Sequence, residues 1–174
     1  MTTTPPTGQS HAPAINTAFA ERPPLVAAMY NPALIACLLS TAAGAYKRQV
    51  PSGMPLALSF IVAPLALHRG TRDSLPTTTS IHLRTWMERN PIVRAGFPDR
   101  AQALVSPVRQ GLRFALRHQI LELRADNLLP QSRLPAKVPE HPELDDILRI
   151  GRLLGRWLAK NDTATVFALM GVTP

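Results

Sequence analysis

Residues 25–46 contain no charged side chain, and this run constrains the fold more than any other feature of the sequence. It is long enough to span a bilayer, so a membrane segment is one alternative. Its many alanines, two hydroxyl residues and one glycine keep its hydrophobicity low. Asn31-Pro32 lies within it and is a helix-start signal, with Asn as the N-cap and Pro in the first turn. We therefore expect a buried helix over residues 32–48 rather than a membrane span.

A second apolar run, residues 54–67, is too short to span a membrane and contains two prolines. We expect it to be the most buried helix, because it is apolar on every side. Pro64 should kink or end this helix, and a strand over residues 58–62 is the competing interpretation. The polar residues 70–80 should form a connector into a helix over 80–90.

Prolines also divide the second half of the chain. Residues 91–97 predict another connector, and Pro107 is expected to separate a helix at 98–105 from one at 107–118. The sequence ILEL-RADN-LLP at 120–130 has the pattern of a β-hairpin. Residues 130–142 contain four prolines and predict an extended surface loop.

The C-terminal region predicts two helices. Residues 142–161 carry acids in the first turns and bases in the last, which suits the helix dipole. Asp162 should cap a last short helix that ends at Gly171. The fold class expected is mainly α: one helical domain over residues 25–174 with a small hairpin, compatible with a winged helix. Residues 1–24, polar and rich in Pro and Thr, predict a disordered tail.

The chain is strongly basic, with a formal net charge of +8. All of its 19 basic residues are arginines except Lys47, Lys137 and Lys160. Arginine makes planar, bidentate contacts to carboxylate or phosphate, so DNA, an acidic protein or an anionic membrane could each be a partner. The single cysteine, Cys37, excludes a disulfide within the chain and zinc sites built on cysteine pairs. It fits a cytoplasmic location, and the N-terminus lacks the pattern of a secretory signal.

Catalytic chemistry has little support in the sequence. No histidine pair has a metal-binding spacing, and neither a nucleophile elbow nor a phosphate-binding glycine loop is present. The acidic residues stand mostly at expected helix starts or turns, where they compensate helix dipoles. We therefore expect no catalytic residue, no metal site and no cofactor.

Rows of basic residues are the clearest positive signal. Arg109, Arg113 and Arg117 follow a four-residue spacing on one helix face, and Arg124 stands in the expected hairpin. This group predicts contact with nucleic acid or an anionic partner, because a winged helix uses a helix and a hairpin to bind DNA. A solvated basic face is the alternative interpretation.

Two further groups predict a partner interface. The first is a row on the expected helix over 142–161 together with a neighbouring aromatic residue: Arg149, Arg152, Arg156, Lys160 and Trp157. Trp157 is either a core residue or an interface anchor. The second group is the segment LHRGTRDSLP, in which Asp73 is expected to pair locally with Arg69 or Arg72. His68, Arg69, Arg72 and Asp73 form the interface hypothesis for this segment.

The order of several segments is similar to that of a known family. Those segments are NPALIACLLSTAAGAY, GMPLALSFIVAPLALHRGTRDSLP, LRTWMERNP, GFPDRAQALVSPVRQGLRFALRH and LGRWLAKNDTATVFALMGVTP. Together they resemble the middle component of bacterial three-component ABC systems, the group that includes Lamassu-type anti-phage defence. The resemblance covers about residues 30–174, and its most specific parts are LHRGTRDSLP and GRWLAK…TVFALMGV.

This resemblance implies a small non-enzymatic adaptor subunit. It would act with an SMC/Rad50-like ABC ATPase that senses foreign DNA, and with a third component that bears an effector, often a nuclease. The family supplies no residue-level roles for this chain. A free-standing winged-helix DNA-binding protein is the alternative, and an enzyme with an unrecognised site is a third hypothesis.

Overall fold

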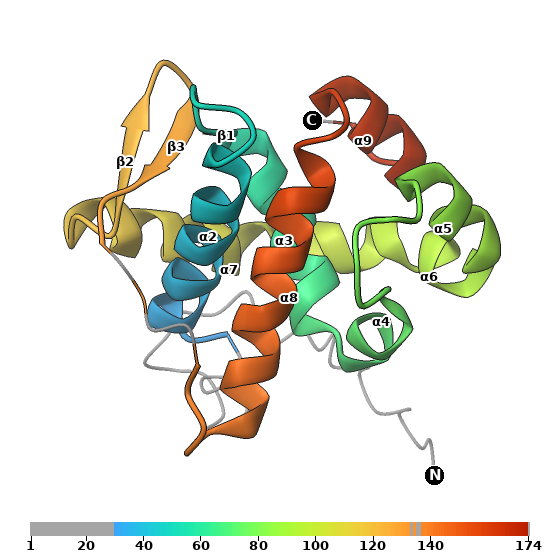
Figure 1. Ribbon diagram of the computed structural model, residues 1–174, viewed down its shortest axis with the longest axis horizontal. Helices are drawn as coiled ribbons and strands as arrows, with labels where there is room; N and C mark the ends of the chain where they lie inside the picture. Colours follow the sequence, from blue (N-terminus) through green and yellow to red (C-terminus); the bar gives the residue numbers. More distant parts are fainter. Residues whose placement is uncertain (1–29, 133, 135–136, 174) are drawn as a thin grey trace, which may run out of the picture.

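The computed structural model describes residues 30–173, except residues 133, 135 and 136, and is mostly helical with a small sheet (Figure 1). Two buried helices form its middle: α2 (Pro32–Lys47) and α3 (Ser59–Leu67). Both pack against α7 (Phe97–Arg117) and against α8 (Pro142–Leu158). In Figure 1, α8 lies in front of α3 and beside α2, and α7 crosses behind these helices. The molecule therefore presents α7 and α8 on opposite sides.

The long uncharged run folds as a buried helix, as expected. Asn31 caps α2, since its Oδ1 accepts a hydrogen bond from the backbone N–H of Ala33 at 2.8 Å. Most of the α2 side chains that follow are buried, including Ile35, Leu38 and Leu39. None of the helices in the described part of the chain combines the length and the apolarity needed to cross a membrane.

Glycines allow α2 and α8 to approach closely. A Cβ at Gly151 would lie 2.9 Å from Leu38 Cδ1, and one at Gly155 would overlap the carbonyl oxygen of Ala42. Because Gly151 faces Leu38 and Gly155 faces Ala42 one turn later, the two helices run in the same direction. Their basic C-terminal ends are consequently neighbours.

A three-stranded antiparallel sheet lies at one end of the molecule, with strand order β1-β3-β2. Its strands are β1 (Met54–Pro55), β2 (Leu121–Arg124) and β3 (Asn127–Pro130). The hairpin between β2 and β3 is confirmed: Ala125 and Asp126, at φ 44° and 65°, form a two-residue turn with both central residues left-handed. The sequence analysis did not predict β1, which pairs Met54 with Leu128.

The remaining elements are short. They are η3 (Leu56–Leu58), α4 (Arg69–Ser74), α5 (Leu83–Arg89), α6 (Pro91–Ala95) and α9 (Thr163–Met170). The order of elements along the chain is compatible with a winged helix: α2, β1, α3, α7, β2 and β3, with α4 to α6 inserted between α3 and α7. Asp162 caps α9 by accepting from Thr165 N–H at 2.8 Å, and Gly171 ends it at φ 68°, both as expected.

Some expected boundaries are wrong. Pro107 does not divide α7, which continues through it, because Leu104, Val108 and Leu112 are buried on both sides of the proline. Their packing against α2 and α3 outweighs the lost backbone hydrogen bond. The two expected connectors also contain short helices, α4 and α6.

The second apolar run is helical, so the strand alternative over 58–62 is wrong. Its helix, α3, continues past Pro64 to Leu67. The described residues of the proline-rich segment 130–142 that lie between β3 and α8 form neither helix nor strand. The expected tail, residues 1–24, lies outside the described residues.

Candidate partner-binding surfaces

The polar segment LHRGTRDSLP forms the joint between α3, α4 and α8. Arg72 is only 4% exposed, and its guanidinium donates to the carbonyls of Ala66 (2.9 Å) and Leu67 (3.2 Å) at the end of α3. The same guanidinium pairs with Glu143 and, at 3.2 Å, with Asp146, both on α8. Arg72 is therefore a structural residue, and the expected exposed partner contact at this position is wrong.

The ion pair expected between Asp73 and Arg69 or Arg72 does not form among the described residues. Arg72 points inward instead, because buried carbonyls and two α8 carboxylates compete for it. Arg69 and Asp73 remain exposed on α4. A partner could reach both of these charged residues.

His68 acts as the N-cap of α4. Its Nδ1 accepts from the backbone N–H of Thr71 at 3.1 Å and lies 2.8 Å from the Thr71 hydroxyl. Partial burial, with the cations Arg100 and Arg72, lowers the pKa of His68 below its ordinary value of 6.5. The ring is thus held in its neutral form, which a capping acceptor requires.

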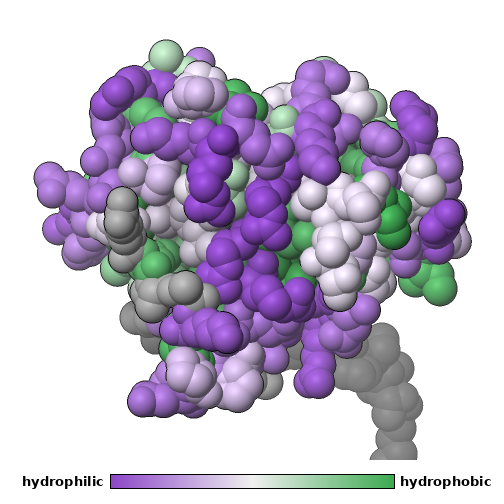
Figure 2. Space-filling view, viewed as in Figure 1, coloured by the Kyte–Doolittle hydropathy of each residue, from purple (hydrophilic) through white to green (hydrophobic). Residues whose placement is uncertain are grey.

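The α8 surface consists of Arg149, Arg152 and Arg156, joined by Arg48 from the end of α2. Arg149 pairs with Asp146 at 2.6 Å, whereas Arg48, Arg152 and Arg156 form no ion pair with another described residue. Burial lowers the pKa of Arg152; Asp145 opposes this shift, and Arg156, Arg149 and Arg48 add to it. Positive charges therefore lie close together on the α8 surface, and a bound anion would reduce their mutual repulsion. Figure 2 shows strongly hydrophilic residues in a band over α8.

Two predicted members of this group have other roles. Trp157 is 1% exposed, donates from Nε1 to the carbonyl of Ile81 at 2.7 Å and packs edge-on against Trp86. It is a core residue, so the interface-anchor alternative is wrong. Lys160 Nζ donates to the carbonyl of Thr79 at 2.6 Å and to its hydroxyl at 3.0 Å, which ties the segment before α5 to α8.

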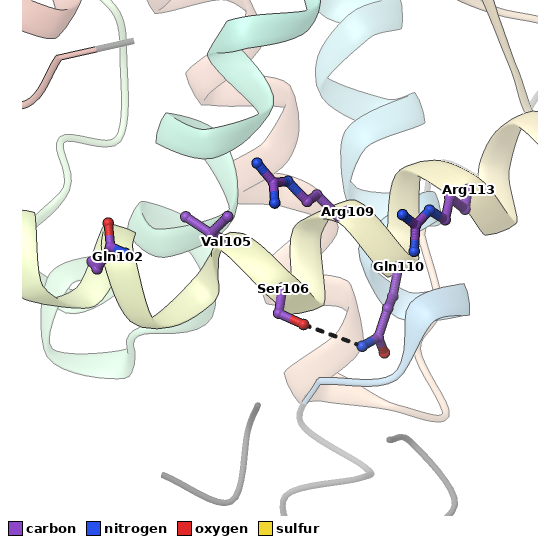
Figure 3. A pocket seen from close by; sticks show the side chains of 6 residues that line it. All are labelled: Gln102, Val105, Ser106, Arg109, Gln110 and Arg113. Atoms are coloured by element: carbon purple, nitrogen blue, oxygen red, sulfur yellow. Dashed lines mark hydrogen bonds between the residues drawn. The ribbon is translucent and has the colours of Figure 1, made fainter. Parts of the chain in front are cut away.

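The α7 surface consists of Arg109, Arg113 and Arg117, all exposed. None of the three forms an ion pair with another described residue. A hollow of about 340 Å³ lies beside the first two arginines. Its lining residues, all on α7 and all labelled in Figure 3, are Gln102, Val105, Ser106, Arg109, Gln110 and Arg113.

Arg124, grouped with this row by sequence, is separate from it. It lies on β2 and donates to Glu122 at 3.0 and 2.7 Å. The other carboxylate oxygen of Glu122 accepts from Gln131. With Asp126 in the turn, the hairpin carries two acids against one arginine. The hairpin is therefore not a basic surface.

A family model described as "ABC-three component (ABC-3C) system Middle Component 3" matches residues 19–174. The chain belongs to this family. No curated protein and no solved structure matches it.

This middle component shows no metal cluster within the residues that the structure describes. Cys37 is half-buried on α2, and burial raises the pKa of its thiol, which favours the protonated form. The residue that sequence reasoning missed is Arg48. It stands at the end of α2 as an ordinary basic helix terminus, and only the parallel packing of α2 and α8 brings it to Arg152.

Proposed function

We propose that this middle component is a non-enzymatic adaptor in a cytoplasmic anti-phage defence complex. It would bridge an SMC/Rad50-like ABC ATPase and a third component that bears the effector. Family membership supports work within a three-component ABC system. The observation that carries the bridging role is the arginine surface on each of α7 and α8, on opposite sides of the middle layer. An adaptor needs two such separate surfaces.

The chemistry of both surfaces favours acidic partners. Arg109, Arg113, Arg152 and Arg156 form no ion pair within 4.0 Å of a carboxylate among the described residues, although the chain uses such pairs elsewhere. An unpaired arginine can take a carboxylate bidentately. Arg69 and Asp73 on α4 would add a smaller contact of mixed charge.

The test is co-expression of the chain with the ATPase and the third component, followed by purification through a tag on this chain. Charge reversal on α7 (Arg109→Glu with Arg113→Glu) should release one component and retain the other. Reversal on α8 (Arg152→Glu with Arg156→Glu) should release the component that the α7 variant retains. The matched control is Arg84→Glu with Arg89→Glu on α5, where both arginines are exposed. Bridging is refuted if both reversals leave the complex whole.

A free-standing winged-helix DNA-binding protein is the second candidate. The basic α7 next to a hairpin favours it, because such proteins place a helix in the major groove and a wing on the backbone. The acidic residues of the hairpin count against a wing that contacts phosphate. In this case the isolated protein would bind a short duplex with an affinity that falls steeply with salt. Alanine at Arg109, Arg113 and Arg117 would abolish that binding.

A further inference from the structure

One row of side chains along α7 changes character halfway. Ala101, Val105, Arg109, Arg113 and Arg117 stand four residues apart, so each lies beside the next on the helix surface, and the row turns gradually around the helix axis. The first two are apolar and half-buried, and the three arginines are exposed. Figure 3 shows Gln102, Val105 and Arg109 on the same side of the helix. A ligand lying along this row would meet apolar surface first and positive charge next.

The apolar half of the row faces a larger hollow, of about 810 Å³. Three parts of the fold enclose it: η3 with the start of α3, the first turns of α7, and the end of α9 with the residues after it. Its apolar lining includes Phe60 and Ile61 from α3, Val105 from α7 and Phe167 from α9. The hollow is open to solvent, so these apolar side chains are accessible to a partner.

The two hollows are neighbours along α7, because Gln102, Val105 and Arg109 line both of them. From Ala101 to Arg113 they extend along α7 for about 18 Å, which is roughly three helical turns. Asp99 also lines the apolar hollow. We call the two hollows together the α7 groove.

We infer that the α7 groove binds an amphipathic helical segment of a protein partner, with apolar side chains in the hollow and carboxylates on Arg109 and Arg113. This inference rests on the proposed adaptor function and specifies the partner at one of its two surfaces. A partner helix of about three turns matches the groove in length, and helix-in-groove binding uses apolar anchors at such spacing. A nucleic acid would use the arginines and leave the apolar half empty, so the groove favours a protein.

The direct test places a photo-crosslinking amino acid at Gln102 in the full chain, co-expressed with the other two components. Gln102 is exposed and lines both hollows. The crosslinked peptide, sequenced by mass spectrometry, should contain apolar residues three or four apart and acidic residues within the next two turns. The control position is Ala95, exposed on α6, which should give no such crosslink.

Variants then test each half of the groove separately: Arg109→Glu with Arg113→Glu reverses the charged half, and the following changes test the apolar half. Ala101→Trp fills the apolar hollow without a change of charge and should weaken binding of the crosslinked component at least about tenfold. Val105→Asn serves the same purpose if the tryptophan variant does not fold. Arg84→Glu with Arg89→Glu on α5 is the matched charge control, because both arginines are exposed and line neither hollow.

The outcomes separate the inference from the proposed function. An intact complex with no crosslink at Gln102, or with full binding by both Ala101→Trp and Val105→Asn, overturns the groove and leaves the adaptor role standing. A crosslink to DNA, or to a basic segment, overturns the groove as well. A chain that assembles with neither component refutes the adaptor role and, with it, the inference.

Discussion

Arg72 and the arginines of the α7 surface have the same side chain and opposite surroundings. Arg72 is buried and satisfied by two carbonyls and two carboxylates, although its segment looks like a site in the sequence. Arg109 and Arg113 lie on the plain amphipathic face of a helix and have no acidic partner among the described residues. A concentration of polar residues therefore does not mark a binding surface. What marks it is charge that the fold leaves uncompensated.

The largest effect is expected from removing the buried side chain of Arg72. Arg72→Ala takes away the shared partner of α3 and α8, and we expect a loss of about 3 kcal/mol in the free energy of unfolding. The estimate lies at the low end for buried pairs because Glu143 and Asp146 can still be hydrated. Thermal melting should show a drop of roughly 6–12 °C.

The neighbouring Arg69→Ala is the control for Arg72, since Arg69 is exposed on the same short helix. Its melting temperature should stay close to that of the wild type. Equal losses for the two variants would mean that the buried contacts of Arg72 do not hold the joint.

The next largest effect tests how the α8 surface is assembled. Gly155→Ala forces a methyl group against the carbonyl of Ala42, and we expect it to cost about 2 kcal/mol. Gly151→Ala should cost less, because its nearest atom is the end of a flexible leucine side chain. The measurement is chemical denaturation of both variants. If Gly151→Ala is the more damaging change, the two helices do not depend on the close approach at Gly155.

These cases show where prediction from sequence succeeds. Local signals gave the starts of α2 and α9 at Asn31 and Asp162 and the turn of the hairpin, because the residues that decide them are a few positions apart. The pairing of Arg72 with Glu143 spans 71 residues, and no local pattern encodes it. The continuation of α7 through Pro107 also depends on neighbours distant in sequence. Packing outweighs a local helix breaker there.

For the candidate surfaces, the spacing in the sequence placed basic residues in rows on α7 and α8. It did not show which residues of these rows have partners within the fold. Lys160 follows the helical spacing as well as Arg152 does, and Trp157 stands beside the row, yet they donate hydrogen bonds to Thr79 and Ile81. Arg48 has no spacing that links it to α8. The partners of a side chain depend on which helices become neighbours, and spacing within one helix does not contain that information.

A smaller effect is expected for the exposed arginines of the α7 surface. Arg109→Ala with Arg113→Ala should change the free energy of unfolding by less than about 0.5 kcal/mol, because both side chains are exposed and neither forms an ion pair with another residue that the structure describes. Thermal melting of the isolated protein measures it. A loss as large as that of Arg72→Ala would make the α7 row structural, and the contrast between the two regions would disappear.

The smallest effect concerns His68, which lies in the same joint as Arg72. Because burial, Arg100 and Arg72 hold the pKa of His68 below 6.5 in the folded state, the unfolded chain takes up this proton at a higher pH. The stability that the neutral cap contributes is complete above about pH 6.5 and is lost as pH falls through the folded pKa. Protonated Nδ1 can no longer accept from Thr71 N–H.

His68→Asn keeps a capping acceptor that does not titrate in this range, so it isolates the contribution of the proton. Between about pH 7.5 and about pH 5.5, the melting temperature of the wild type should fall further than that of the variant. His82→Asn is the matched control, because the side chain of His82 makes no capping hydrogen bond at the start of α5. The melting temperature of this variant should fall with pH as much as that of the wild type. If the melting temperature of His68→Asn falls as much as that of the wild type, the pH sensitivity comes from another group. Of His68 and Arg72, only Arg72 would then stabilise the joint.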